Sequence, residues 1–412
     1  MEAEQSMVFK IVTNLSLAFA IDFWCVFSYA EDYHFYINAD FTYNVSSGES
    51  IHMGIETALS ETSHSIHGKT IKLLKCDHKG INSRSEACIR SYLNDPKALI
   101  MYAGLHSPPL ITNLKNHGSP TQLNESEILT LVPWAAAGSI TRDGPPNWIY
   151  RLSIDDKYAG KFILKETLKE GFTKIGLLLV NDGWGKYNFK NITSEMQKQG
   201  VEATEVIMFE RDLTEDVAKL HLRRLVQKPL DAIIMVSNAP QAITIFKGIK
   251  SLGFENKFAI RSHWGITGGN LWNEVGSIIK NTDLRVIQTK FSFHRPDLNI
   301  FQKNVFAQAR RIFPQLYDYS NLKAPVGFIH GYDITRIAIE SMRKSRLSGI
   351  PHKDKHIIKA QLEKMEVPVE GLIKTYSLPF QRFSKKQQDS HEALSVKDYR
   401  MFRYTADGNL IE

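Results

Sequence analysis

The chain has 412 residues, of which 43% are hydrophobic and 23% are charged, and its formal net charge is +7. This length is enough for two domains with separate cores, and the composition is that of a folded protein. The positive residues are scattered, with local density only at 353–364 and 382–386, and no zinc-finger, RNA-binding or basic-zipper pattern accompanies them. We therefore expect a solvated surface and no nucleic-acid partner.

The first thirty residues resemble an export signal. One lysine, Lys10, precedes an apolar stretch that ends in the small-x-small sequence Ser28-Tyr29-Ala30, with Ala18-Phe19-Ala20 as a second possible cleavage site. Asp22 interrupts the apolar stretch, which disfavours the alternative of a retained membrane-spanning anchor; a buried strand is the third alternative. We expect residues 1–30 to be a signal peptide and the mature protein to be periplasmic or otherwise extracytoplasmic.

Loss of the signal peptide removes Cys25 and leaves Cys76 and Cys88. Cys76 ends a predicted strand and Cys88 lies in the next predicted helix, so a disulfide between them is one expectation for an oxidising compartment. Two unpaired buried thiols are the alternative. No Cys/His spacing is typical of a metal site, so we expect no bound metal.

Strands and helices alternate through the first part of the mature chain. We predict strands at 33–38, 70–76, 98–103 and 129–132, with helices at 48–62 and 83–93 between them. Strict alternation favours a parallel sheet that is covered by helices on both faces.

A second set of alternating elements begins after Tyr150-Arg151. Asp155 and Asp156 are typical of a helix N-terminus. The predicted strands are 174–181, 203–209, 231–237, 257–260 and 284–289, and the predicted helices are 188–200, 215–227, 241–252 and 271–280. Helices at 300–313, 324–343 and 355–364 and a late strand at 399–404 follow. The sequence thus predicts an α/β protein with two doubly wound parallel-sheet lobes.

The order of short motifs resembles the type I periplasmic binding proteins, in particular the branched-chain amino-acid-binding group that serves ABC importers. The similarity spans nearly the whole mature chain, and it rests on the succession of motifs rather than on any single one. The segments that carry it are Gly48 with Gly54, IHGKTIKLLKCDHKG, Ala103 to Ser107, Leu131 to Ala136, Asn147 to Arg151 and Lys174 to Asn188.

This resemblance implies two lobes joined by three crossover strands, with a ligand cleft between lobes that close like a hinge. Lobe 1 is expected to comprise residues 31–150 plus 289–375, and lobe 2 residues 151–288 plus 376–412. A monomer is expected, with membrane subunits of an ABC permease as its partners and without a cofactor.

Unusual side chains follow the predicted strand ends, where open parallel sheets bind ligands. The expected ligand-binding residues are Tyr43, His106, Ser107, Trp134, Ala135, Ala136, Trp184, Asn238, His263 and Trp264. By resemblance, Ser107 and the N–H groups of Trp134 and Ala135 bind a ligand carboxylate. Ala136 replaces a family threonine, so one donor is missing.

Trp264 stands where the family has the glutamate that neutralises the ligand's ammonium group. Burying an ammonium group without a counter-charge weakens binding by several kcal/mol. Contact with the face of a tryptophan ring contributes only about 0.5–2 kcal/mol in the opposite direction. Either the ligand is not a free amino acid or another acid compensates, with Asp40 and Asp182 as the candidates. An aromatic ring or a methylated ammonium compound would suit the tryptophan walls, and His106 and His263 could instead pair with a carboxylate.

No catalytic residue is expected. The stretch Gly265 to Gly269 lacks the lysine of a phosphate-binding loop and the spacing of a dinucleotide fingerprint, and we expect a flexible turn there. His106 and Ser107 are adjacent and point to opposite faces, and no G-x-S-x-G elbow occurs. We expect a solute-binding protein, with a ligand-sensing receptor domain of the same fold as the alternative.

Overall fold

The computed structural model describes residues 32–142 and 144–412. The predicted signal peptide and Cys25 lie outside the described residues. Within the described part of the chain, no helix is both long enough and apolar enough to cross a membrane.

The first sheet has the strand order β2-β3-β1-β4-β5-β6 and is parallel except for β2. Its strands are β1 (Tyr33–Ala39), β2 (Ser65–Ile66), β3 (Lys69–Asp77), β4 (Ala98–Ala103), β5 (Thr130–Val132) and β6 (Ile149–Arg151). The helices associated with it are α2 (Val45–Ser60), α3 (Asn82–Leu93), α4 (Ser107–Lys115), α10 (Ile300–Ile312), α11 (Pro325–Arg343) and α12 (Pro351–Leu362). This sheet and these helices are called lobe 1 below.

Alternation along β1 explains why helices cover both faces of this sheet. Phe35 and Ile37 belong to the apolar cluster that includes residues of α2 and α11, whereas Tyr36 belongs to the cluster that includes α3 and α4. Successive side chains of a strand point to opposite faces, so an almost wholly apolar strand needs cover on both.

The second sheet has the strand order β15-β14-β11-β10-β9-β7-β8, and only β14 and β15 run antiparallel to their neighbours. Its strands are β7 (Ile175–Val180), β8 (Ala203–Phe209), β9 (Ala232–Val236), β10 (Ala259–Ser262), β11 (Leu284–Thr289), β14 (Tyr399–Tyr404) and β15 (Leu410–Ile411). Its helices are α5 (Asp156–Lys169), α6 (Gly183–Lys198), α7 (Glu215–Leu225), α8 (Ala239–Leu252) and α9 (Leu271–Ile279). Helices α5 and α6 pack together, as do α7, α8 and α9; this assembly is called lobe 2.

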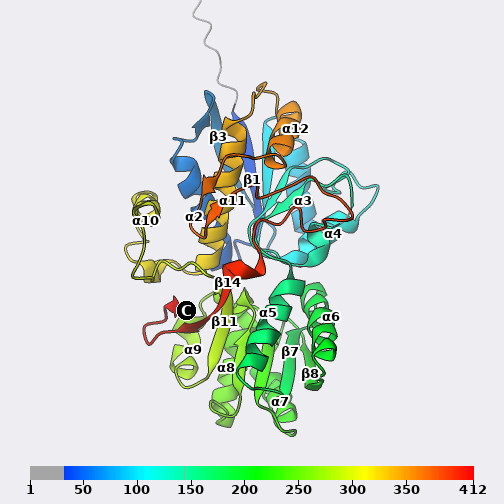
Figure 1. The fold of residues 1–412 in the computed structure, drawn as a ribbon, viewed down its shortest axis with the longest axis vertical. Coiled ribbons are helices and arrows are strands. Elements are labelled where there is room, and N and C mark those ends of the chain that lie inside the picture. Colours follow the sequence, from blue (N-terminus) through cyan, green and yellow to red (C-terminus); the bar gives the residue numbers. More distant parts are fainter. Residues whose placement is uncertain (1–31, 143) are drawn as a thin grey trace, which may run out of the picture. The chain divides into compact units, whose positions relative to one another are not determined.

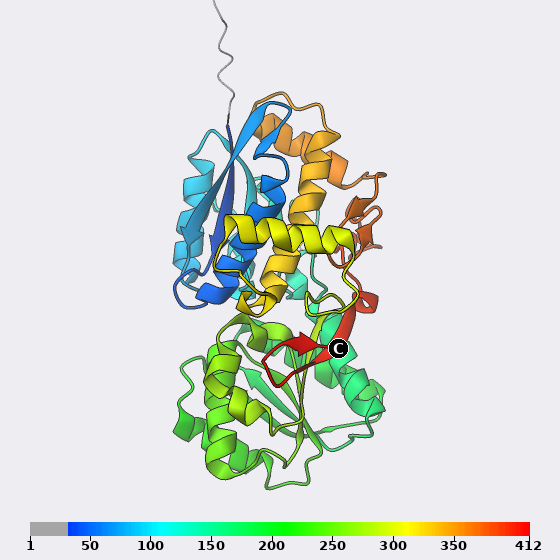
Figure 2. The ribbon, with the colours of Figure 1, turned by 90° about the vertical axis from the view of Figure 1, so that its left-hand side faces the viewer.

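The chain passes between the lobes three times (Figures 1 and 2): from β6 to α5, from β11 to α10, and from residues 376–398 to β14. A small hairpin, β12 (Val369–Glu370) with β13 (Thr375–Tyr376), precedes the last passage. Short 3-10 helices occur at η1 (Gly138–Ile140), η2 (Trp264–Gly268), η3 (Tyr319–Asn321) and η4 (Val396–Asp398). The predicted fold class is confirmed.

The segment before β14 lies along the first crossover. The Arg151 N–H donates to the His391 carbonyl and the Ala393 N–H donates to the Arg151 carbonyl, both at 2.9 Å. The second sheet resumes only at Tyr399. The exact lobe boundaries stay a prediction.

Cys76 at the end of β3 and Cys88 in α3 form a disulfide. Of the two alternatives that the sequence leaves open, the structure therefore has the cross-link, which ties a strand of the first sheet to a helix on its face.

A buried carboxyl group anchors the β12–β13 hairpin to α11. Asp333 is fully buried and accepts hydrogen bonds from the Leu372 N–H (2.6 Å), the Ile373 N–H (3.1 Å) and the Tyr376 hydroxyl (2.7 Å). Burial raises the pKa of Asp333 to about 6, although these hydrogen bonds act to lower it. The folded protein therefore binds the Asp333 proton more tightly than the unfolded chain does.

We expect Asp333 to make the free energy of unfolding fall as the pH rises. In the folded state Asp333 keeps its proton up to its pKa of about 6, whereas the unfolded chain loses that proton at pH ~4. Up to about 3 kcal/mol of the free energy of unfolding is therefore lost as the pH rises between these two values. Urea unfolding of the wild type and Asp333→Asn across this range isolates the effect from other carboxyl groups. A difference between the two proteins that does not vary with pH would contradict this assignment.

Candidate functional site

The carboxyl ends of parallel strands in both sheets lead to one cavity between the lobes. In lobe 1, β4 leads to His106 and Ser107, and β5 leads to Trp134. In lobe 2, β7, β8, β9 and β10 each lead to a wall residue. This is the position at which open α/β sheets bind ligands.

The structure brings most of the predicted site residues together. The cavity is lined by Leu105, His106, Ser107, Pro108, Trp134, Ala136, Asp182, Trp184, Arg211, Asn238, Trp264 and Gly265. Its volume is only about 20 Å³, which is space for roughly one water molecule. A ligand the size of a ring can enter only if the lobes separate or the tryptophan rings turn.

Three predicted site residues lie elsewhere. The Tyr43 side chain is 70% exposed and is not part of the cavity wall. Ala135 is buried in the core cluster of lobe 1 that includes α3 and α4. His263 is fully buried behind the wall. A residue near a strand end lies close to the cleft. Whether its side chain points into the cleft depends on the local backbone conformation, which the sequence pattern does not predict.

The stretch 264–268 is a buried 3-10 helix, η2, where the glycines of 265–269 predict a flexible turn. The glycines provide space for close packing. A Cβ atom at Gly265 would lie 2.5 Å from the Ser237 carbonyl oxygen and 2.8 Å from Cη2 of Trp184, and one at Gly268 would lie 2.6 Å from Oγ of Ser47. The Ser47 hydroxyl donates to the Gly268 carbonyl, so this close approach also joins α2 of lobe 1 to lobe 2.

Trp134 forms the lobe 1 side of the cavity. Its side chain is fully buried, and its indole Nε1–H has no hydrogen-bond partner among the described residues. A Cβ atom at Gly327 of α11 would lie 3.1 Å from the Trp134 ring, so this glycine leaves room for the indole. A buried donor without a partner in a cavity wall is available to a ligand acceptor.

His263 lies behind the two lobe 2 tryptophans. Its ring makes edge-type contacts with Trp184 (centroids 5.0 Å apart) and Trp264 (4.2 Å). Its Nε2 atom lies 2.7 Å from Oδ1 of Asp156, and both side chains are fully buried. The two atoms are close enough for an ion pair, but their angles do not fit a hydrogen bond. Neither side chain has a hydrogen-bond partner among the described residues. The Asp156 N–H donates to the Ala136 carbonyl of the cavity wall.

Both acids that are candidates for balancing a ligand ammonium group are already engaged. Asp182 accepts from the N–H groups of Trp184 and Gly185 through Oδ1, and from Nε (3.0 Å) and Nη2 (2.6 Å) of Arg211 through Oδ2. Asp40 lies 3.2 Å from Nε2 of His106 and accepts from Asn44 and from the Tyr43 N–H.

Burial acts to raise the pKa of Asp40, but these hydrogen bonds outweigh it and hold the pKa well below its usual value. Asp40 is therefore ionised at neutral pH, and its charge is satisfied within lobe 1.

Arg211 is the wall residue that the sequence reasoning missed. It follows the end of β8 by two positions, so the rule that found the tryptophans would also have found it. Its side chain is 41% exposed and forms the mouth of the cavity together with Asp182.

Comparisons with known proteins agree with this geometry. The sequence profile of a family described as "Periplasmic binding protein" matches residues 42–408. No curated protein matches the sequence significantly.

Several solved structures have a similar fold. A type 1 periplasmic binding protein from Bordetella pertussis has a TM-score of 0.74 at 16% identity, covering 91% of this chain and 97% of its own. A solute-binding protein of an ABC transporter from R. palustris, in complex with benzoate, has a TM-score of 0.74 at 14% identity, with 92% and 95% covered. LivJ from Streptococcus pneumoniae, a branched-chain amino acid transporter substrate-binding protein in complex with isoleucine, has a TM-score of 0.71 at 15% identity, with 92% and 99% covered. At such identities the similarity establishes the fold.

Proposed function

Because the chain belongs to the periplasmic binding protein family, a family of binding proteins rather than enzymes, we propose that it captures a small carboxylic acid with a flat apolar body between its lobes. We further propose that it is exported and delivers this ligand to the membrane permease of an ABC importer. Membership of the branched-chain amino-acid-binding group remains a prediction. The main support for a carboxylic acid as the ligand is that the acidic side chains around the cavity are already paired with basic ones.

Positive potential converges on the cavity from the backbone. Helices α4, α6 and α8 begin at Ser107, Gly183 and Ala239, beside or within the wall, and neither α4 nor α8 has a side-chain cap. Helix N-termini favour anions. Pro108 and Pro109 remove two N–H donors from α4, but the Ser107 hydroxyl remains as a donor there, because its oxygen accepts only from the Ala137 N–H (3.3 Å).

An ammonium group, in contrast, would find no free carboxylate among the described residues around the cavity. Asp182 is bound by Arg211, Asp40 by His106, and Asp156 lies behind the wall against His263. A buried cation without a partner costs several kcal/mol. These pairs favour an acid without an amino group over an α-amino acid.

The apolar part of the ligand is expected to be flat. Trp134, Trp184 and Trp264 supply three indole rings to one cavity, and aromatic side chains favour offset-stacked or edge-to-face contacts with another ring. Similar folds bind benzoate, 4-hydroxybenzoate and 3,4-dihydroxybenzoic acid, which supports an aromatic acid as the ligand class.

Capture requires motion between the lobes. The cavity of about 20 Å³ cannot hold a benzene ring, and the Ser47–Gly268 hydrogen bond joins the two lobes. We infer that this contact breaks when a ligand enters and that the lobes close again on the occupied site by hinge motion.

Trp264→Ala is expected to weaken benzoate binding by at least about tenfold, because it removes a large apolar contact from the ligand. Trp148→Ala is the matched control: both indoles are 3% exposed, but Trp148 lies at the start of β6 and does not line the cavity. Calorimetric titration of the folded variants with benzoate measures the effect. Equal losses in the two variants would contradict a ligand-facing role for Trp264.

The ligand class is tested with a thermal-shift panel of benzoate, benzylamine and phenylalanine. A ligand at a hundred times its dissociation constant stabilises by about 2.7 kcal/mol, and benzoate alone is expected to do so. Stabilisation by phenylalanine or benzylamine, but not by benzoate, would overturn the proposed class.

A further inference from the structure

A second and larger cavity lies on the other side of η2. Its volume is about 280 Å³, against about 20 Å³ for the first. Thr267 of η2 contributes to its wall, whereas Trp264 and Gly265 face the first cavity. The remaining walls come from the start of α9 and the β14–β15 turn in lobe 2, from residues 292–294 between β11 and α10, and from residues 319–325, which lead into α11 of lobe 1.

The polar groups in this wall are mainly neutral amides and hydroxyls that the protein itself does not use. Asn270 and Asn273 are exposed at the cavity and Asn409 is partly buried there, and within the described residues none of these side chains hydrogen-bonds to another protein group. Each amide offers two donor hydrogens and an acceptor oxygen. Tyr404 also lines the cavity, and burial raises the pKa of its hydroxyl, which keeps it neutral.

Charge is confined to exposed positions of the wall. Lys323 and Asp407 are exposed, and Lys323 donates to the Ser320 carbonyl. His294 is half-buried, and burial lowers its pKa, so its ring is neutral at pH 7. An ionic ligand would find no buried counter-charge here, whereas an uncharged ligand with several hydroxyl groups would find several donors and acceptors.

Two aromatic pairs supply apolar surface. Trp272 stacks on Tyr404 with centroids 5.4 Å apart, and Tyr319 stacks on Phe293 at 5.6 Å. All four side chains line the cavity. The lining as a whole is of mixed polar and apolar character, and the volume lies just below the range that holds drug-sized compounds.

We propose that this cavity is a second ligand site, distinct from the carboxylate site, and that it takes an uncharged polyhydroxy compound the size of a monosaccharide. The C–H faces of such a compound contact the aromatic edges, and its hydroxyls bind the asparagine amides. An occupant contacts lobe 2 and the segment before α11 together, so it stabilises the arrangement of the lobes in this structure.

Calorimetric titration of the mature protein with D-glucose, D-ribose and myo-inositol tests the proposal. At least one of these is expected to bind, and Asn270→Ala and Asn409→Ala are each expected to weaken it by about tenfold, the effect of losing one or two hydrogen bonds. Asn270 is the N-cap residue of α9 but makes no side-chain capping bond, and neither the Asn270 nor the Asn409 side chain hydrogen-bonds to another described residue, so both variants are expected to fold, and thermal unfolding checks this.

Asn281→Ala is the matched control. Asn281 is exposed just beyond α9, donates only to the Ser277 carbonyl and does not line the cavity; the variant is expected to bind as the wild type does. Absence of binding by all three probes overturns the proposal. So does binding that the Asn270 and Asn409 variants retain in full, or that the Asn281 variant loses equally. None of these results depends on benzoate, so the second site and the carboxylate site are tested separately.

Discussion

Replacing His263 by leucine is expected to lower the free energy of unfolding by about 3 kcal/mol, the effect of leaving a buried carboxyl group without its polar neighbour. His263 and Asp156 are fully buried, with Nε2 and Oδ1 2.7 Å apart, so the variant leaves the carboxyl group without its partner. The same change removes the ring that contacts Trp184 and Trp264. Benzoate affinity and tryptophan emission are therefore expected to change with stability.

His391→Leu provides the comparison. His391 is also fully buried and stacks on an aromatic ring, that of Tyr150 at 4.1 Å, but it lies in the segment before β14 and not behind the cavity. Its loss is expected to lower stability while the benzoate affinity of the folded protein stays unchanged. If both variants alter benzoate affinity equally, His263 has no special role in positioning the tryptophans. The double variant His263→Leu, Asp156→Leu should recover part of the lost stability, because it leaves no polar group of this pair buried without a partner.

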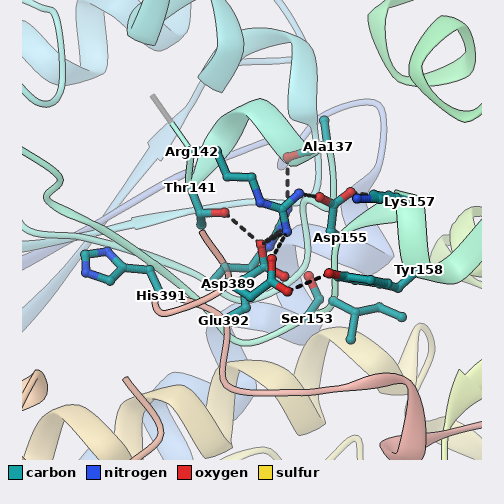
Figure 3. A network of polar contacts seen from close by, with 12 residues as sticks. Ala137, Thr141, Arg142, Ser153, Asp155, Lys157, Tyr158, Asp389, His391 and Glu392 are labelled. Carbon is teal, nitrogen blue, oxygen red and sulfur yellow. Dashed lines mark hydrogen bonds and ion pairs between the residues drawn. The ribbon is translucent and has the colours of Figure 1, made fainter. Parts of the chain in front are cut away.

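The second large effect is expected at the crossover between the lobes (Figure 3). Glu392 accepts from Nη2 of Arg151 at 2.6 Å, Nη2 of Arg142 at 2.9 Å and the Thr141 hydroxyl at 2.9 Å. Arg151 is fully buried, and its remaining side-chain hydrogen bond goes to the Ala137 carbonyl. Glu392→Ala removes the only carboxylate paired with this guanidinium among the described residues, so we expect a loss of about 3–5 kcal/mol in urea unfolding.

Asp389 belongs to the same network and serves as the control. It pairs with Arg142 at 2.5 Å, but its side chain is 49% exposed, and exposed ion pairs contribute about 0–1 kcal/mol. Asp389→Ala should therefore change stability little. If Glu392→Ala and Asp389→Ala lower the free energy of unfolding by similar amounts, the burial of Arg151 does not determine how much this network stabilises the protein. Arg142 also pairs with Asp155, the N-cap of α5, so the network joins the end of lobe 1, the start of lobe 2 and the last passage of the chain.

The fold could be predicted from the sequence because most strands are short apolar segments whose ends are clearly marked. The segments 98–103, 203–209, 284–289 and 399–404 were predicted with the bounds that the structure has. Helix starts were harder. Helix α4 was not predicted; two prolines follow Ser107, and proline is tolerated in the first turn of a helix. Helix α6 begins at Gly183, five residues before the predicted start, because Asp182 acts as its N-cap.

The site was accessible only in outline. The rule that ligands bind beyond strand ends selected the three tryptophans and His106, which do share one cavity. It did not reveal that His263 turns inward to Asp156, or that Asp40 and Asp182 are already paired, because these contacts join residues far apart in the chain. The ligand class depends on those pairings, so the sequence left an ammonium compound and a carboxylate as equal alternatives.

A crystal structure of residues 31–412 with benzoate would show whether a carboxylic acid binds among the tryptophans between the lobes. We expect the ring against Trp184 and Trp264, and the carboxylate at the Ser107 hydroxyl and the adjoining helix N-termini, with the Asp182–Arg211 pair intact. Benzoate bound elsewhere, or bound with its carboxylate directed away from lobe 1 into solvent, would contradict it.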